Sequence, residues 1–233
     1  MNLFAPILNL LFPSRCPICS HPSNEHSHNP ICAACWSDIV PYHGPKCSIC
    51  GMPTKSQYTG TCGDCLHTAP PFSKIMYYGI YEGTLRESIH LLKFGGIKRL
   101  AQPLSKLLLS LPASQCDAIL PVPLHRNKLR EREFNQTALL GKHLSMALKR
   151  PLLLHSFQKV RETKLQTEVS GRERYTNLRK AYAASDDVRG KNILLVDDVI
   201  TTGATVRECA ATLKRAGARQ VEVIALAHSM PRL

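Results

Sequence analysis

The sequence is short of aromatic and acidic residues and contains no long hydrophobic run. Aromatic residues make up 6% of its 233 positions, and 17 acidic residues stand against 30 basic ones, giving a formal net charge of +13. No apolar stretch approaches the roughly 20 residues that span a bilayer, so no transmembrane segment is predicted. The composition, 44% hydrophobic and 20% charged, is typical of a globular chain and excludes low-complexity, collagen-like and wholly disordered proteins.

The N-terminal apolar run, residues 2–13, is the part of the chain most similar to a targeting segment. No Lys or Arg precedes it, no small-residue cleavage site follows it, and Asn9 interrupts it. These features predict a buried or docking helix rather than a signal peptide. We therefore expect a cytoplasmic protein.

Charge and cysteine are unevenly distributed along the chain. Residues 1–70 hold three basic and three acidic residues, so residues 71–233 hold the other 27 basic and 14 acidic residues. Eight of the ten cysteines lie in the first part. Two such different compositions predict two domains, 1–70 and 71–233, with the boundary near Pro70.

The eight N-terminal cysteines form four Cys-x-x-Cys pairs. Such a pair brings two sulfur atoms onto one turn, where both reach a metal ion at about 2.3 Å, and two pairs supply a tetrahedral zinc site. The sequence therefore predicts a double zinc ribbon with two structural Zn²⁺ ions, which stabilise a segment too poor in apolar residues to fold alone. With consecutive pairs combined, the ligands are Cys16, Cys19, Cys32 and Cys35, then Cys47, Cys50, Cys62 and Cys65.

The spacing leaves alternatives to this arrangement. A cross-braced pairing would use the same eight cysteines, and His26 and His28 could serve as extra ligands. Disulfides or a redox Cys-x-x-Cys fit less well, because nothing indicates secretion and no βαβ pattern surrounds the pairs. Zinc ribbons bind nucleic acid or protein, or brace a neighbouring domain, and the motif does not distinguish these roles. Cys116 and Cys209 lie on apolar patterns and are expected in the core.

From residue 71 onward, strand and helix patterns alternate. Apolar, β-branched or aromatic runs predict strands at 74–82, 117–122, 191–198 and 221–229, with a further strand at 151–157. Amphipathic runs predict helices at 84–94, 100–111, 134–148 and 205–216. This order is typical of an α/β fold with a mostly parallel sheet, in which ligands bind at the carboxyl ends of the strands.

Residues 193–205 join a buried strand to a helix through a tight turn at such an end. Asp197 and Asp198 are paired carboxylates that suit hydrogen bonds from the vicinal hydroxyls of a ribose. The turn then supplies hydroxyls and a flexible glycine, so that consecutive backbone N–H groups can point at one phosphate. Its residues are Thr201, Thr202, Gly203, Ala204 and Thr205.

The segment LLVDDVITTGAT resembles the phosphoribosyl pyrophosphate (PRPP) motif of type I phosphoribosyltransferases. The resemblance implies that fold for the α/β part, with a smaller zinc-ribbon domain before it. It also implies that Asp197 and Asp198 are the catalytic pair on the ribose, that residues 201–205 hold the 5′-phosphate, and that Mg²⁺ accompanies the pyrophosphate.

Over nearly its whole length the chain resembles the competence protein F (ComF) family. The resemblance rests on the cysteine pairs, the PRPP motif and five short fragments: KFGG at 93–96, PVPLH at 121–125, REFNQ at 132–136, TKLQ at 163–166 and RYTN at 174–177. The family usually has glycine where Glu133 stands. A glycine there would serve a positive φ or a close approach of substrate. We favour the other interpretation, that Arg132 and Glu133 open a helix whose first turn accommodates a carboxylate.

Basic residues concentrate between positions 126 and 191, where sixteen stand against seven acidic residues. Lys128 lies within a cluster of arginines that closely follows the predicted strand at 117–122. Arginine neutralises phosphate through paired hydrogen bonds, and four cations exceed what one pyrophosphate needs, so the surplus suits nucleic-acid phosphates. The candidates for pyrophosphate or nucleic-acid binding are Lys93, Arg126, Arg130 and Arg132.

These features predict a PRPP-binding phosphoribosyltransferase-like protein, and the ComF resemblance implies a role in DNA uptake and natural transformation. In an active enzyme, an acceptor would displace pyrophosphate from the ribose anomeric carbon, and no segment identifies the acceptor. The alternative is a non-catalytic module that retains the PRPP fold and binds single-stranded DNA or a DNA-uptake helicase. The intact acid pair argues against a purely structural scaffold.

Overall fold

The computed structural model describes residues 15–23, 30–54, 60–113, 115–162 and 181–230. The apolar run at 2–13, the two histidines at 26 and 28, and the fragments at 163–166 and 174–177 lie outside the described residues. The interpretations given for them stay predictions.

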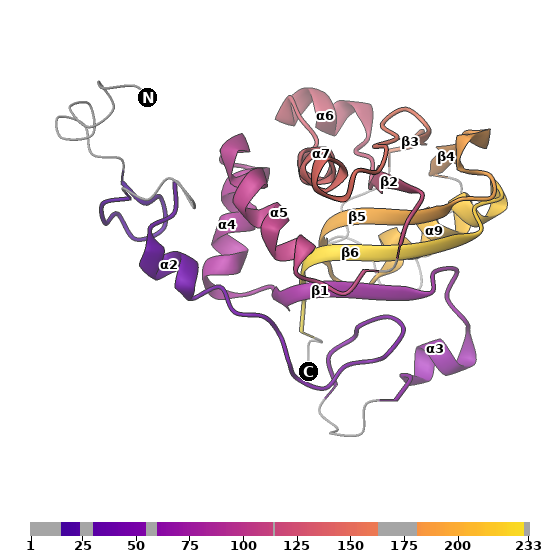
Figure 1. Cartoon of the computed structure of the whole chain (residues 1–233), viewed down its shortest axis with the longest axis horizontal. Helices are drawn as coiled ribbons and strands as arrows, with labels where there is room; N and C mark the ends of the chain where they lie inside the picture. Colours follow the sequence, from indigo (N-terminus) through magenta and orange to yellow (C-terminus); the bar gives the residue numbers. More distant parts are fainter. Residues whose placement is uncertain (1–14, 24–29, 55–59, 114, 163–180, 231–233) are drawn as a thin grey trace.

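A four-stranded parallel sheet forms the centre of the fold (Figure 1). Its strands lie in the order β1 (Lys74–Ile80), β6 (Gln220–His228), β5 (Asn192–Ile200) and β2 (Ala118–Pro121). Nearly all residues of the two middle strands, β5 and β6, are buried, as expected for a parallel sheet covered on both faces. The predicted α/β class with a parallel sheet is confirmed.

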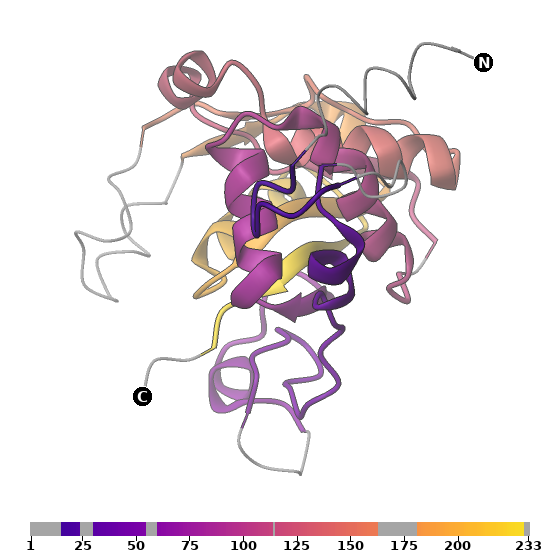
Figure 2. The same ribbon diagram turned by 90° about the vertical axis from the view of Figure 1, so that its left-hand side faces the viewer.

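Helices cover both faces of this sheet (Figures 1 and 2). On one face, the leucines of three helices pack against alternate strand residues such as Leu194; these helices are α4 (Gly83–Lys93), α5 (Ala101–Leu109) and α7 (Gln136–Leu148). On the other face, α9 (Ala204–Arg215) packs against the intervening residues, such as Leu195. Because strand side chains alternate between faces, the two hydrophobic clusters are the two sides of one sheet.

Shorter elements complete the described chain: α2 (Ala33–Ser37), α3 (Gly63–His67), η1 (Lys98–Leu100), α6 (Arg126–Arg132), η2 (Asp186–Val188), and an antiparallel pair of strands, β3 (Phe157–Lys159) and β4 (Tyr182–Ala184). The strand expected at 151–157 forms only at its end. Leu152 makes an isolated parallel bridge with Ile119, and the chain then bends at an exposed Leu154 before β3 begins. The apolar run 152–154 thus covers the edge of β2 rather than extending the sheet.

The cysteine-rich segment packs on both faces of the same sheet (Figure 2). Ile39, after the first four cysteines, joins the cluster under α4, α5 and α7, whereas Ile49 packs on the α9 side. Between them the chain runs along the edge strand β1. Tyr42 N donates a hydrogen bond to Tyr78 O at 2.7 Å, and Ile75 N donates one to Ile49 O at 2.8 Å. The segment therefore covers a sheet edge that would otherwise expose unpaired backbone groups.

Helix α6 ends at the position where the ComF resemblance leads us to expect glycine. Glu133, the residue after α6, adopts a left-handed φ of 63°. The next helix, α7, begins only at Gln136, and its N-cap residue Asn135 accepts a hydrogen bond from Thr137 N at 3.0 Å. Our favoured interpretation, that Arg132 and Glu133 open a helix, is therefore wrong. Glycine would suit position 133 because it adopts a positive φ readily.

We expect Glu133→Gly to raise the free energy of unfolding by about 1 kcal/mol, because glycine adopts a positive φ without the steric cost of a side chain. Chemical denaturation measures the change. Glu131→Gly is the matched control within α6 and should lower the free energy of unfolding by about 1 kcal/mol. A loss of stability in Glu133→Gly would contradict the backbone conformation described here.

Candidate functional site

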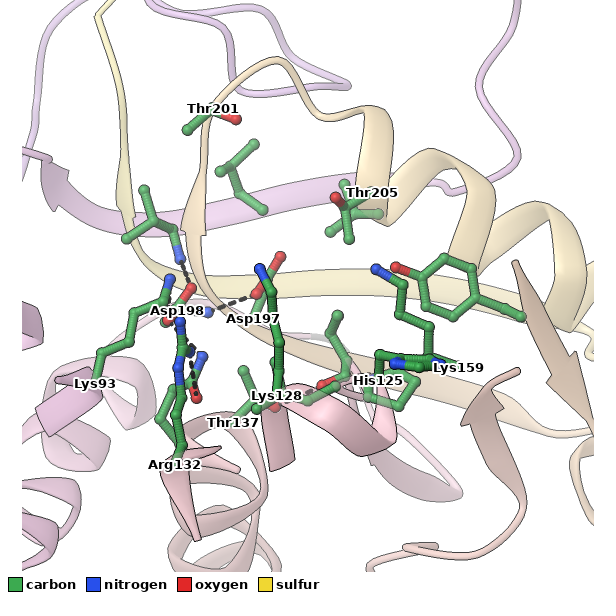
Figure 3. A pocket seen from close by; sticks show the side chains of 18 of the residues that line it. Lys93, His125, Lys128, Arg132, Thr137, Lys159, Asp197, Asp198, Thr201 and Thr205 are labelled. Atoms are coloured by element: carbon green, nitrogen blue, oxygen red, sulfur yellow. Dashed lines mark hydrogen bonds and ion pairs between the residues drawn. The ribbon is translucent and has the colours of Figure 1, made fainter. Parts of the chain in front are cut away.

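A cavity of about 380 Å³ opens at the carboxyl ends of β5 and β2 (Figure 3). Its wall is formed by the end of α4, the loop after β2, helix α6, the end of β5 and the first turn of α9. This is the edge of the sheet at which an α/β pattern predicts ligand binding. Its ionisable side chains include two carboxylates, four cations and a histidine: Asp197, Asp198, Lys93, Lys128, Arg132, Lys159 and His125.

Asp198 is held by three contacts from different elements. Its Oδ2 lies 3.0 Å from Lys93 Nζ and accepts a hydrogen bond from Gln136 Nε2 at 2.8 Å. Its Oδ1 accepts a hydrogen bond from Val199 N at 2.7 Å. The preceding carboxylate, Asp197, accepts a hydrogen bond from Asp198 N at 2.9 Å through Oδ1. The side chain of Asp198 is 5% exposed and that of Lys93 is 24% exposed, so the ion pair is largely withdrawn from water.

The two carboxyls have opposite pKa shifts. Burial and the neighbouring Asp198 charge raise the pKa of Asp197 well above its usual range. Burial also acts to raise the pKa of Asp198, but the charge and hydrogen bond of Lys93 outweigh it, and this pKa lies below its usual range. Burial acts to lower the pKa of Lys93, and the Asp198 charge more than compensates. Lys93 and Asp198 therefore form a charged pair, while Asp197 keeps its proton to a higher pH than an ordinary carboxyl.

The turn between β5 and α9 brings the start of a helix to the cavity. Gly203, the N-cap of α9, has a φ of 72°, and a Cβ built there would meet no atom within 4 Å. The backbone angle, not a close approach, is thus what favours glycine. Thr201, Gly203 and Thr205 line the cavity, whereas Thr202 lines a crevice beside the second cysteine group and Ala204 is buried. No acidic residue lies in the first turn of α9 to compete with a bound anion.

Of the four candidate phosphate-binding cations, the structure brings two to the cavity. Lys93 and Arg132 line it, whereas Arg126 and Arg130 are exposed and lie outside the lining. Helix α6 explains this division, because positions 126 and 130 are neighbours on one helical face while Lys128 and Arg132 are neighbours on another. The sequence predictions did not include this helix, so its three arginines could not be sorted in advance.

Two residues that line the cavity had no role in the sequence analysis: Lys159 was not singled out at all, and His125 appeared only as part of the quoted fragment PVPLH. Lys159 extends from β3 toward the cavity, with Nζ 5.7 Å from the centre of the Tyr182 ring (Figure 3). Burial and the charge of Lys128 lower the pKa of Lys159. No local motif marks Lys159, and only the pairing of β3 with β4 places it here. Gln136 belonged to a quoted fragment, but its contact with Asp198 was not foreseen.

The eight N-terminal cysteines form two groups of four free thiols, and in each group the Sγ atoms lie within 4.8 Å of one another. Sγ atoms of Cys19 and Cys32 are 3.4 Å apart, and those of Cys50 and Cys62 are 3.6 Å apart. Tetrahedral Zn²⁺ with sulfur ligands at about 2.3 Å requires sulfur–sulfur distances of about 3.8 Å, so both groups fit the ion. Consecutive pairs combine, as predicted, and the cross-braced alternative is wrong.

The first cysteine of each group has a lowered pKa. Burial acts to raise the pKa of Cys16 and Cys47, but backbone N–H groups that donate to each sulfur lower it to about 6. Cys62 N, for example, donates to Cys47 Sγ at 3.3 Å. These donors favour the thiolate, which is the form that binds metal. Burial instead raises the pKa of Cys116 and Cys209, which lie in the hydrophobic clusters as predicted.

The second cysteine group borders the turn that precedes α9. Cys50 and Cys65 line a small crevice together with Thr202, Gly203 and Arg207. The first group lies against the opposite hydrophobic cluster, under α4, α5 and α7. Two chemically similar sites therefore support different faces of the sheet, and the second shares its crevice with Gly203, which also lines the cavity.

Comparison with known proteins agrees with this architecture. The double zinc ribbon domain model matches residues 7–66, and the phosphoribosyl transferase domain model matches residues 138–232. DNA utilization protein YhgH of Escherichia coli (strain K12) is 34% identical over 233 residues, covering 95% of this chain and 100% of that protein. Competence protein F of Haemophilus influenzae is 31% identical over 234 residues, covering 94% of this chain and 98% of that protein. The chain belongs to the competence protein F family.

A solved structure is also similar to this competence protein F family member. Glutamine PRPP amidotransferase from Bacillus subtilis, complexed with ADP and GMP, matches with a TM-score of 0.43 and 25% identity. The match covers 59% of this chain and 30% of the amidotransferase chain, so it spans less than a third of that enzyme.

Among the described residues, no helix combines the length and hydropathy needed to traverse a bilayer.

We expect Cys16→Ala and Cys47→Ala each to lower the zinc content of this family member from two equivalents to one, because each removes a ligand from a different group. Atomic emission on the purified protein measures the metal. Cys116→Ala removes a buried thiol outside both groups and should keep two equivalents. Two equivalents in either ligand variant would contradict the assignment.

Asp197→Asn should stabilise the protein increasingly as the pH rises from 5.5 to about 7, the pKa of Asp197 in the folded state, and by a constant amount from there to pH 8. The raised pKa of Asp197 means that the folded state binds this proton more tightly than the unfolded chain does. The free energy of unfolding therefore falls as pH rises above the ordinary carboxyl pKa of about 4, and asparagine removes that loss. Thermal unfolding measures it, with about 2–4 °C expected for each kcal/mol.

Asp187→Asn is the control of opposite sign. Hydrogen bonds from Ser156 and Ser185 lower the pKa of Asp187, so its carboxylate stabilises the fold above the ordinary carboxyl pKa. Its asparagine variant should be less stable than the parent protein throughout this pH range. Equal pH profiles for Asp197→Asn and the parent protein would contradict the raised pKa.

Proposed function

We propose that this protein binds PRPP with Mg²⁺ in the cavity beyond β5 and acts as a phosphoribosyltransferase-like protein in the uptake or use of DNA. One observation carries the proposal: a buried acid pair, a turn with a positive φ at Gly203 and the start of α9 follow one another along a single cavity wall. Asp197 and Asp198 would accept hydrogen bonds from the ribose hydroxyls. Residues 201–205 would hold the 5′-phosphate at the helix start.

The cations of the cavity suit the pyrophosphate end of this ligand. Lys93 and Arg132 line the cavity close to Asp198, and a guanidinium can neutralise phosphate oxygens in pairs. Lys128 and Lys159 supply further positive charge from other elements. Four cations against two carboxylates, one of which has a raised pKa, leave an excess of positive charge that a polyanion would neutralise.

The carboxylates of the cavity fit Mg²⁺ only as a partner of the ligand. Asp198 Oδ2 is engaged by Lys93 and Gln136 and Oδ1 by Val199 N, which leaves room on Oδ1 for one ribose hydroxyl but not for a metal ion as well. Mg²⁺ in such sites is typically held by one or two carboxylates together with substrate phosphates. Asp197 is the carboxylate able to contribute, and the ion when bound would neutralise charge on the departing pyrophosphate.

In a transfer reaction, the bond between the anomeric carbon and the pyrophosphate oxygen breaks and a bond to the acceptor forms. Positive charge then develops on the ribose, and the ionised Asp198 would stabilise it from a site largely withdrawn from water. The same proposal divides the chain into a ribbon domain, 1–70, and a phosphoribosyltransferase-like domain, 71–233. Free thiols in metal-type groups suit a reducing compartment, and we propose a cytoplasmic location on that ground.

A second candidate function is a binding module without turnover that engages single-stranded DNA or a DNA-uptake helicase. The observation that favours it is the position of Arg126 and Arg130, which are exposed on α6 beside the cavity but do not line it. Relatives named for DNA utilization and competence make nucleic acid the natural partner for such cations. Nucleic-acid binding through them would weaken with increasing salt.

We expect PRPP with Mg²⁺ to raise the melting temperature of the parent protein and to leave Asp198→Ala and Asp198→Asn unchanged. At about 100 times its Kd, a ligand adds about 2.7 kcal/mol, or roughly 5–10 °C for a chain of this size. Asp198→Asn keeps the shape of the side chain, so its failure to respond cannot be attributed to a cavity. Differential scanning fluorimetry measures the shift.

Asp186→Ala is the matched control, because its side chain is 85% exposed and does not line the cavity. It should respond to PRPP as the parent protein does, and all variants should retain two equivalents of zinc. If PRPP still raises the melting temperature of both Asp198 variants, the proposed site is contradicted. If PRPP raises the melting temperature of the parent protein but no pyrophosphate is released in the presence of acceptors, the second candidate function, a binding module without turnover, is favoured.

A further inference from the structure

An aromatic ring stands exposed at the mouth of the cavity. Phe94, the residue after α4, lines the cavity and is 57% exposed. Among the large hydrophobic side chains that are exposed in the described part of the chain, it is the one aromatic residue. Exposing so large an apolar surface has a cost in free energy, and the packing of the core does not require it.

The ring is held in place by the same residues that hold the acid pair. The Arg132 guanidinium lies 4.6 Å from the centre of the Phe94 ring, and its Nη1 donates a hydrogen bond to Gln136 Oε1 at 3.4 Å. Gln136 in turn donates to Asp198 Oδ2, which also pairs with Lys93, the residue before Phe94. The contacts therefore form a closed ring that joins the ends of α4, α6 and β5 to the first residue of α7.

A second pair of the same kind lies beside the first. Lys98 Nζ is 5.0 Å from the centre of the Phe134 ring. Both pairs bridge the same two segments, 93–98 and 132–134, and each segment supplies one aromatic ring and one cation. Arg99 and Arg130 are exposed next to these segments, together with two glutamates, Glu131 and Glu133.

Alternating aromatic rings and cations are the surface that single-stranded nucleic acids require. Bases stack on aromatic faces irrespective of sequence, and neighbouring cations contact the phosphates and add cation–π attraction. A double helix offers no free base faces to such a surface. The surface also continues into the cavity, because Phe94 and Lys93 both line it together with the acid pair.

We propose that Phe94 and Phe134, with Arg132 and Lys98, form a stacking surface for the bases of single-stranded nucleic acid at the mouth of the cavity. This assignment rests on the proposed function, since it directs the end of a strand toward the PRPP site. It also assigns a binding role to Phe94, which lies in the KFGG fragment at 93–96.

The test uses the full-length, zinc-loaded protein and a fluorescein-labelled octathymidylate, with binding measured by fluorescence anisotropy. We expect Phe94→Ala to weaken binding about 5-fold or more, the loss typical of one base–aromatic stack, and Phe94→Trp to retain it. Because Phe94 contacts no phosphate, the dependence of affinity on salt should be the same in Phe94→Ala and the parent protein. Met146→Ala, which truncates a side chain 66% exposed on α7, should bind within twofold of the parent protein.

Three results would overturn the assignment. Phe94→Ala could bind the octamer within twofold of the parent protein. Phe94→Trp could bind as weakly as Phe94→Ala, which would mean that the loss is not one of stacking. Thymidine monophosphate could bind as tightly as the octamer with the same dependence on Phe94, which would make the surface a free-nucleotide site.

The PRPP thermal shift of the parent protein separates this assignment from the proposed function. If PRPP raises the melting temperature but Phe94→Ala binds the octamer as the parent protein does, the stacking surface is contradicted and the PRPP site is supported. If Phe94→Ala weakens octamer binding but PRPP does not change the melting temperature of the parent protein, the PRPP site is contradicted and the stacking surface is supported.

Discussion

The ion pair between Lys93 and Asp198 is the interaction on which the site depends. Its atoms lie 3.0 Å apart, its carboxylate is almost fully buried, and it joins the end of α4 to the end of β5. Removing either partner would leave a buried, uncompensated charge, which is far more costly than the pair itself. The pair also lowers the pKa of one carboxyl of the acid pair, while burial and that negative charge raise the pKa of the other. One contact thus gives two adjacent aspartates pKa values that are shifted in opposite directions.

The cations of the cavity come from elements that are distant in sequence. Lys93 belongs to α4, Lys128 and Arg132 to α6, and Lys159 to β3, and like charges gather there only because the fold enforces it. The lowered pKa of Lys159, caused by burial and by the charge of Lys128, reflects this repulsion between like charges. A phosphorylated ligand would reduce the repulsion by neutralising positive charge. The two cysteine groups lie outside the cavity. One packs on the α4 side of the sheet, and the other lies beside the turn before α9.

Most of the fold followed from local patterns. The four main strands and the helices α4, α5, α7 and α9 lie close to their predicted ranges, because hydrophobic periodicity reports burial on a covered sheet. Helix α6 was not predicted because none of its residues is buried, so it has no apolar periodicity to detect. The strand expected at 151–157 failed for the converse reason, since an apolar run can cover the edge of a strand without extending a sheet.

The sequence by itself determined the contiguous features: the four Cys-x-x-Cys pairs, the acid pair and the turn before α9. In each of these, residues a few positions apart meet because local geometry brings them together. Only the tertiary structure decided which cations reach the cavity, that Lys159 joins them, that Glu133 adopts a positive φ, and that Phe94 lies against Arg132. These outcomes depend on the phase of a helix and on contacts between distant segments. Such contacts arise from packing the whole chain, and no single stretch of sequence records them.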